Sequence, residues 1–154
     1  MSEATRIADQ LRRAFSGDAW HGDSLSEILE GVTPAQAAAR PMANAHTIWE
    51  LVLHIAAWDG AVFRRLGGAT VELSDEENFP PVTDTGLAAW HKTLADLRLS
   101  HEDLIAAVAA LPDYRLDEPV PGKEGAHYNF YYMLQGVVQH ELYHAGQIAL
   151  LKKV

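Results

Sequence analysis

The sequence predicts an all-α protein, an antiparallel four-helix bundle with short extra helical turns after the first helix. Four long segments place their apolar residues at helical spacing, and no stretch shows a convincing alternation of period two. The chain has 154 residues, of which 48% are hydrophobic and 21% are charged, as in an ordinary globular protein. No internal repeat or linker divides it, so we expect a single domain over residues 1–154.

The first bundle helix is expected from about Ser2 to Phe15, where apolar residues recur at helical spacing until Gly17 ends the pattern. Two capping boxes follow, one opened by Ser24 and one by Thr33. Each should begin a short helical turn.

Three further helices complete the expected bundle. A capping box at Thr47 opens the second helix, which should run to the glycine pair after Leu66. Residues 69–81 are acidic and end in two prolines, so they read as a surface connection. An unbroken heptad register predicts the third helix over about 83–111, and Asn129 should cap the fourth.

The charge and the cysteine content exclude several classes of function. The net charge is -9, and no window is rich in Lys or Arg, so nucleic acid and anionic membranes are poor partners. No apolar stretch is long enough to span a bilayer and the N-terminus does not resemble a signal peptide, so we expect a cytoplasmic protein. Because the chain has no cysteine, any metal must be held by His, Asp or Glu.

The segment 137–149 contains the strongest functional pattern. His140 and His144 are four residues apart, so they lie one turn from each other on one helix face. That face otherwise carries an apolar seam that includes Met133, Val137 and Leu151. Two neighbouring imidazoles in a core are costly unless each finds a partner, and one divalent cation satisfies both. The alternative is a polar network in the core.

A third ligand should come from another helix, because a bundle site is assembled from facing side chains. His54 is the best candidate, since it lies in the middle of the second long helix and borders its apolar stripe. His101 also lies on a core register, but a lone histidine there is more often a hydrogen-bonded core residue than a ligand. The sequence also contains three histidines for which we expect only a solvated, polar role: His46, His91 and His127.

Two other metal chemistries fit the sequence poorly. Residues 140–144 match the zinc-protease pattern H-E-x-x-H, but the ten residues that follow contain no His, Asp or Glu to serve as the third ligand. A di-iron site needs Glu-x-x-His on two helices, and the second match, Glu124 to His127, falls in a loop rich in Pro and Gly. A single mononuclear ion is the better hypothesis.

Three blocks together resemble the DinB-like superfamily of metal-binding four-helix bundles, especially its YfiT-like branch. These are Trp49 to Trp58 around His54, the two histidines before Gly146-Gln147-Ile148, and the Trp20-His21-Gly22 loop. The resemblance implies a long crossover connection, a homodimer, and one divalent ion on His54, His140 and His144. It implies Ni²⁺ or Zn²⁺, with Fe²⁺ as a further candidate.

The resemblance also implies candidate activities, namely thiol-dependent S-transferase or isomerase chemistry with a low-molecular-weight thiol, or hydrolysis. Three imidazoles leave a position open on the ion, where water or a thiol can be activated. Glu50, Glu141 and His21 are the candidate proton carriers. Two hypotheses compete with an enzyme: a non-catalytic, metal-stapled module for a small ligand or a protein partner, and a metal-free network of hydrogen bonds. The aromatic residues, including Trp58 and the cluster at Tyr128–Tyr132, are expected in core or dimer packing.

Overall fold

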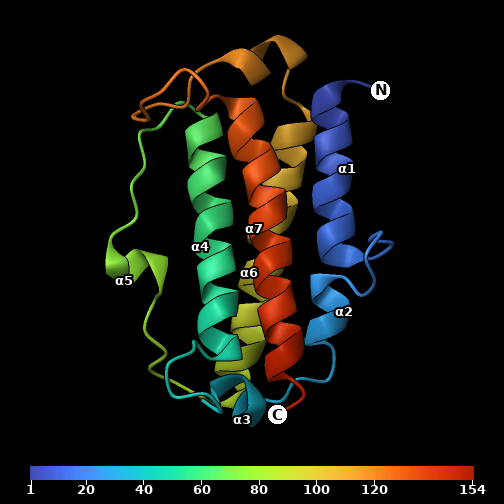
Figure 1. Ribbon diagram of the computed structural model, residues 1–154. Coiled ribbons are helices and arrows are strands. Elements are labelled where there is room, and N and C mark those ends of the chain that lie inside the picture. Colours follow the sequence, from blue (N-terminus) through green and yellow to red (C-terminus); the bar gives the residue numbers. More distant parts are fainter.

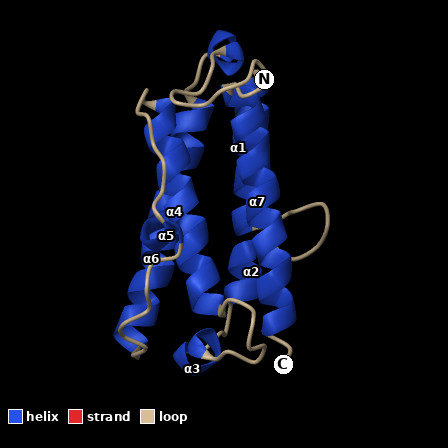
Figure 2. Ribbon diagram, turned by 60° about the vertical axis from the view of Figure 1, so that its left-hand side comes forward, coloured by secondary structure: helices blue, strands red, loops and turns tan.

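The computed structural model describes residues 1–154, which form helices and loops with a single β-bridge between Pro119 and Asn129 (Figure 2). Four long helices make the bundle (Figure 1): α1 (Glu3–Ser16), α4 (Ile48–Leu66), α6 (Leu87–Ala109) and α7 (Phe130–Leu151). Four short elements connect them: α2 (Leu25–Leu29), α3 (Pro34–Ala38), α5 (Asp75–Asn78) and the 3₁₀ helix η1 (Asp113–Asp117). The all-α bundle with extra turns after its first helix is therefore confirmed. None of the helices combines the length and the apolar character that a membrane crossing requires.

The helices that carry the candidate ligands begin at caps that the sequence predicted. The Thr47 side chain accepts a hydrogen bond from the backbone N–H of Glu50, and the Glu50 carboxylate accepts one from the backbone N–H of Thr47. The Asn129 side chain accepts a hydrogen bond from the backbone N–H of Tyr132 at the start of α7. Each such cap contributes about 1 kcal/mol and fixes where the first turn starts. The caps thereby set the height of His54 and of His140 and His144 along the bundle.

The order of the helices is not a simple up-and-down one. Helix α4 packs against α6 and α7, and α1 packs against the same two helices. The antiparallel arrangement holds for α4 with α7 and for α1 with α6, but α4 and α6 begin at the same end of the bundle and run in parallel (Figure 1). Residues 67–86 make this possible, because they return along the outside of α4 and carry α5. This is the long crossover connection that the resemblance implied.

The structure differs from the predictions in the start of α6 and in the connection that precedes it. Helix α6 begins at Leu87 rather than near residue 83, because Gly86 takes the cap position and donates its backbone N–H to the Asp84 side chain. The connection after α4 is not purely irregular, since a capping box at Ser74 starts the short helix α5. This helix places the residues that follow it against the side of α4.

The core is divided into two apolar clusters with polar side chains between them. One cluster fills the end of the bundle near η1, and the other fills the end near α2 and α3. Near the middle, helices α4 and α7 contribute five polar side chains that are buried or half-buried: His54, Asp59, His140, Glu141 and His144. Since burying polar groups is costly unless they are paired, this layer is where a functional site is expected.

Candidate metal centre

Three imidazoles from α4 and α7 converge on one point. The Nε2 atom of His54 lies 2.9 Å from Nε2 of His140 and 3.1 Å from Nε2 of His144. The Nε2 atoms of His140 and His144 are also 3.1 Å apart. The His140–His144 pair is local, because the two residues are one helical turn apart, whereas His54 joins them through the packing of α4 on α7. The three histidines are thus positioned to bind one metal ion.

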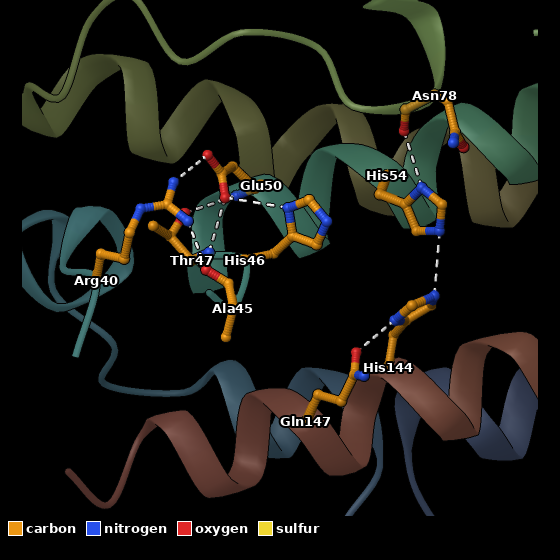
Figure 3. A network of polar contacts seen from close by, with 9 residues as sticks. All are labelled: Arg40, Ala45, His46, Thr47, Glu50, His54, Asn78, His144 and Gln147. Atoms are coloured by element: carbon orange, nitrogen blue, oxygen red, sulfur yellow. Dashed lines mark hydrogen bonds and ion pairs between the residues drawn. The ribbon is translucent and has the colours of Figure 1, made fainter. Parts of the chain in front are cut away.

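The opposite ring nitrogens of two of these histidines fix their tautomers. His54 donates its Nδ1–H to the backbone carbonyl oxygen of Asn78 at 2.8 Å, and His144 donates its Nδ1–H to the side-chain oxygen of Gln147 at 2.7 Å (Figure 3). In a neutral imidazole with its proton on Nδ1, Nε2 carries a lone pair. The lone pairs of His54 and His144 therefore face each other.

Burial keeps the three imidazoles neutral. It lowers the pKa of His140 to about 3, with the neighbouring charges of His144 and His54 adding to the effect. Burial also lowers the pKa of His54 and of His144, against the raising effect of the hydrogen bonds to Asn78 and Gln147. Neutral imidazole is the form that coordinates metals.

These observations fit a divalent metal ion. Three neutral nitrogen donors converge, and two of them cannot donate a hydrogen to each other, so a cation at the centre relieves the repulsion between their lone pairs. Nitrogens bound to a tetrahedral ion at ~2.1 Å lie about 3.4 Å apart, so the three Nε2 atoms need to separate by only a few tenths of an ångström. With three protein ligands, such an ion would keep an open position.

The crossover connection forms one wall of the metal centre. Phe79 stacks on the ring of His54, with the ring centroids 4.1 Å apart, and its other face stacks on His46 at 3.8 Å. Phe79 directly follows Asn78, whose carbonyl oxygen holds His54. The sequence predicted only a surface connection here, because a loop has no periodicity from which such a contact could be inferred. His46 is exposed, as expected, but it belongs to this wall.

The centre opens into a cavity of about 490 Å³ between α4 and α7. All three histidines line it, together with several aromatic side chains: Trp58, Tyr128, Tyr132 and Tyr143. We expected Trp58 and the Tyr128–Tyr132 cluster in core or dimer packing. Phe130 is indeed buried in the core and Tyr128 packs against it, whereas Trp58 and Tyr132 line the cavity. Trp49 and Trp90 do lie in the core, with their ring centroids 4.9 Å apart. A larger groove of about 950 Å³ lies between α2, α3 and α6, where no group of three His, Asp or Glu side chains converges.

Glu50 and His21, two of the three candidate proton carriers, do not line the cavity. Burial raises the pKa of Glu50, but hydrogen bonds from the backbone of Thr47 and from Arg40 outweigh it and lower that pKa. The Glu50 carboxylate forms an ion pair with Arg40 at 2.6 Å and faces away from His54 (Figure 3). His21 is exposed in the loop between α1 and α2. Neither position supports a role in proton transfer at the metal centre.

Glu141, the third candidate, turns into the bundle core rather than towards the cavity. Its side chain is 1% exposed, and neither carboxylate oxygen has a hydrogen-bond partner. One oxygen lies 3.7 Å from Nε2 of His101. Burial raises the pKa of Glu141 to about 8. Its position between His140 and the core does not support the predicted role of a base beside the metal.

Glu141 belongs to a buried ion-pair cluster that also contains Asp59 and His101. His101 donates its Nδ1–H to Asp59 at 3.0 Å and its Nε2–H to the backbone carbonyl oxygen of Leu11 at 3.1 Å. Burial raises the pKa of Asp59, but with that carboxylate ionised both partners only accept hydrogen bonds, so His101 carries both protons and a positive charge. Burial alone would lower the pKa of His101, but the hydrogen bond to Asp59 and the charge of Glu141 raise it to about 9. His101 is therefore a hydrogen-bonded core residue and not a ligand, as expected. Its partner Asp59 was missed, although it lies only five residues after His54.

The chain matches the family model of the DinB superfamily over residues 18–148. This range contains α4 and most of α7 with all three histidines, and it begins after the end of α1. No curated protein and no solved structure matches the chain. The match covers most of the sequence, and the helical fold agrees with it. The chain belongs to the DinB superfamily.

Proposed function

We propose that this protein is a metal-dependent enzyme of the YfiT-like branch that uses one divalent ion, Ni²⁺ or Zn²⁺ with Fe²⁺ as a further candidate. The reaction is thiol-dependent S-transfer or isomerisation, or the hydrolysis of a small substrate. One observation carries the proposal: three neutral nitrogen donors with converging Nε2 atoms line a cavity of about 490 Å³. A structural metal site is closed by four protein ligands, whereas three ligands at a cavity are the arrangement of a catalytic site.

When bound, the ion would supply Lewis-acid activation of a thiol or of water. The chain's own residues orient the imidazoles and exclude water from them. Asn78 and Gln147 orient the rings of His54 and His144 through their Nδ1–H groups. Phe79 covers one face of His54 and excludes water from it. Because the chain has no cysteine, a reacting thiol must come from a cosubstrate that enters the cavity.

None of the three candidate proton carriers expected from the sequence lines the cavity. Tyr143 lines the cavity, and its ring centroid lies 5.0 Å from that of His144. Its side chain is 66% exposed, so its hydroxyl can exchange protons with solvent. We assign it the role of proton carrier at the cavity mouth. The change Tyr143→Phe should then lower kcat by about 10²-fold, a typical contribution of general acid–base catalysis, and leave the metal content unchanged.

Turnover decides between the two reaction classes. The metal-loaded protein should be assayed against electrophiles with bacillithiol, mycothiol or glutathione, and separately against a panel of esters and amides. We expect turnover in one of the two assays and its loss in His54→Ala. His91→Ala is the matched control, because His91 is exposed on α6 and does not line the cavity. No turnover in either assay by protein with a full complement of metal would contradict the proposal.

A non-catalytic module is the second candidate, and one observation favours it. The ligand His54 is held by the backbone of Asn78, so an ion would also fasten the crossover connection to α4 and α7. Such a staple predicts a large rise in the melting temperature on metal binding, with no turnover.

A homodimer is also proposed. It is supported by the exposed apolar side chains Leu87 and Leu99 on α6, each 59% exposed, and light scattering of the purified protein tests it.

A further inference from the structure

Arg65, near the C-terminal end of α4, is a buried cation without an acidic partner. Its side chain is 1% exposed. Both Nε and Nη2 donate to the backbone carbonyl oxygen of Val71, at 3.2 and 2.7 Å, while Nη1 makes no hydrogen bond within the protein. The pKa of Glu72 is lowered mainly by its pairing with Lys123, and Arg65 contributes least. An arginine keeps its charge throughout, and a buried charge is costly unless a counter-charge accompanies it.

Arg65 lines the same cavity as the three histidines, and its charge there is unopposed. The cavity is lined by 15 residues, of which none is Asp or Glu, although the chain contains 21 of these acids. Arg65 is also the only Arg or Lys among the lining residues. The side chains that line this cavity therefore carry a positive charge, although the protein as a whole is acidic.

Trp58 lies between the arginine and the metal centre. The guanidinium carbon of Arg65 is 5.6 Å from the Trp58 ring centroid, and that centroid is 5.8 Å from the ring centroid of His140. The guanidinium carbon is therefore at most 11.4 Å from the centroid of the His140 ring, the sum of these two distances. The lining of the cavity also includes the apolar side chains of Val62 and Met133. One small molecule can reach both the guanidinium and the histidines.

We propose that the substrate or cosubstrate of the metal centre carries a carboxylate, which binds the guanidinium of Arg65 while the reactive group lies at the histidines. The free Nη1 can donate to one carboxylate oxygen, and a charge-assisted hydrogen bond of this kind is strong in a dry site. The apolar side chains in the lining accommodate a short aliphatic or aromatic spacer. This inference rests on the proposed function, because it uses the same cavity and the same open metal position.

The competing explanation is that Arg65 only fastens the crossover connection through Val71 and packs on Trp58. Two substitutions separate these roles. Arg65→Met keeps the volume and removes the charge, whereas Arg65→Lys keeps the charge. Arg64→Met is the matched control, because it removes a neighbouring charge from the same turn of α4 and Arg64 is exposed outside the cavity.

The test measures the binding of ω-mercapto acids, from mercaptopropionate to mercaptooctanoate, to cobalt-substituted protein. The thiolate-to-cobalt absorption band reports binding, and each acid is compared with the mercapto alcohol of the same length. We expect acids of intermediate length to bind at least about tenfold more tightly than the matched alcohols, a preference that corresponds to about 1.4 kcal/mol. Arg65→Met should abolish this preference without changing the affinity for plain alkanethiols. Arg65→Lys and Arg64→Met should keep it.

Equal affinity of the wild type for acids and alcohols at every length would overturn the inference, and so would a preference that survives in Arg65→Met. In both cases the band itself shows that the metal centre binds thiols, so the proposed function stands. If no thiol produces the band, the thiol-dependent form of the proposed function fails, and the metal-free protein then decides the inference. The same acids must shift the guanidinium ¹⁵N resonance of Arg65, identified by its absence in Arg65→Lys, and an unmoved resonance overturns the inference.

Discussion

Helices α4, α6 and α7 carry two groups of buried polar side chains that lie close together and behave in opposite ways. The metal centre consists of His54, His140 and His144, and the buried ion-pair cluster consists of Asp59, His101 and Glu141. In the cluster, an acidic side chain and a carbonyl oxygen accept both protons of the imidazole, so its charge is satisfied within the protein. In the metal centre, Asn78 and Gln147 accept only the Nδ1–H groups of His54 and His144. The Nε2 lone pairs of these two imidazoles face each other.

The difference shows what decides the role of a buried histidine. Burial alone is similar, since His54 is 5% exposed and His101 is not exposed at all. What differs is whether the second nitrogen meets an acceptor or another lone pair. The cluster should therefore stabilise the fold without metal, and the metal centre should bind metal while contributing little to the metal-free fold.

The largest expected effect is on the cluster. His101→Ala leaves the Asp59 carboxylate buried without its partner, which costs about 3–5 kcal/mol of the free energy of unfolding. Chemical denaturation of the metal-free protein measures this loss. The metal content of the folded variant should stay at the wild-type value, because His101 contacts none of the three ligands. A variant that folds with wild-type stability but loses metal would reverse the roles of the two groups.

The next effect is the pH dependence of the metal-free protein. The pKa of His101 is about 9 in the fold against 6.5 for the free side chain, so the folded state binds the proton more tightly. This stabilisation of the folded state amounts to at most about 3 kcal/mol. It is complete below pH 6.5 and is lost as the pH rises through about 9. Glu141, whose pKa burial raises to about 8, acts in the same direction. Melting temperatures between pH 6 and 10 should fall for the wild type and fall less for His101→Gln. Stability that rises over this range would contradict the assignment of charge.

A smaller effect is expected on the affinity of the metal centre for its ion. Gln147→Ala removes the acceptor that orients His144, and losing such a partner typically weakens metal affinity 10–100-fold. Competition with a chelator of known affinity measures the change. Unfolding of the metal-free protein should be nearly unaffected, because Gln147 lies outside the apolar clusters. Unchanged metal affinity would show that His144 is held by packing alone.

The features of the two groups that the sequence predicted are those that depend on residues close together in the chain. The spacing of His140 and His144, the caps at Thr47 and Asn129, and the place of His54 on its helix depend on residues within a few turns. Together they predict the four long helices and the three histidines that converge.

The remaining features depend on contacts between distant segments. Phe79 stacks on His54 and Val71 accepts a hydrogen bond from Arg65 because residues 67–86 fold back along α4, and a connection without periodicity carries no signal of where it will pack. The core-facing direction of Glu141 was missed because it directly follows a ligand, and neighbouring residues on a helix point about 100° apart. The parallel course of α4 and α6 likewise depends on the connection and not on either helix.

The most direct test of the account is the metal content of protein purified without a histidine tag. The wild type and His91→Ala should each contain one divalent transition-metal ion per chain after loading and removal of free metal. His54→Ala should contain less than about a tenth of this amount while keeping its helical circular dichroism. If His54→Ala retained a full equivalent of metal, or if the wild type bound none, the three converging imidazoles would not be a metal site.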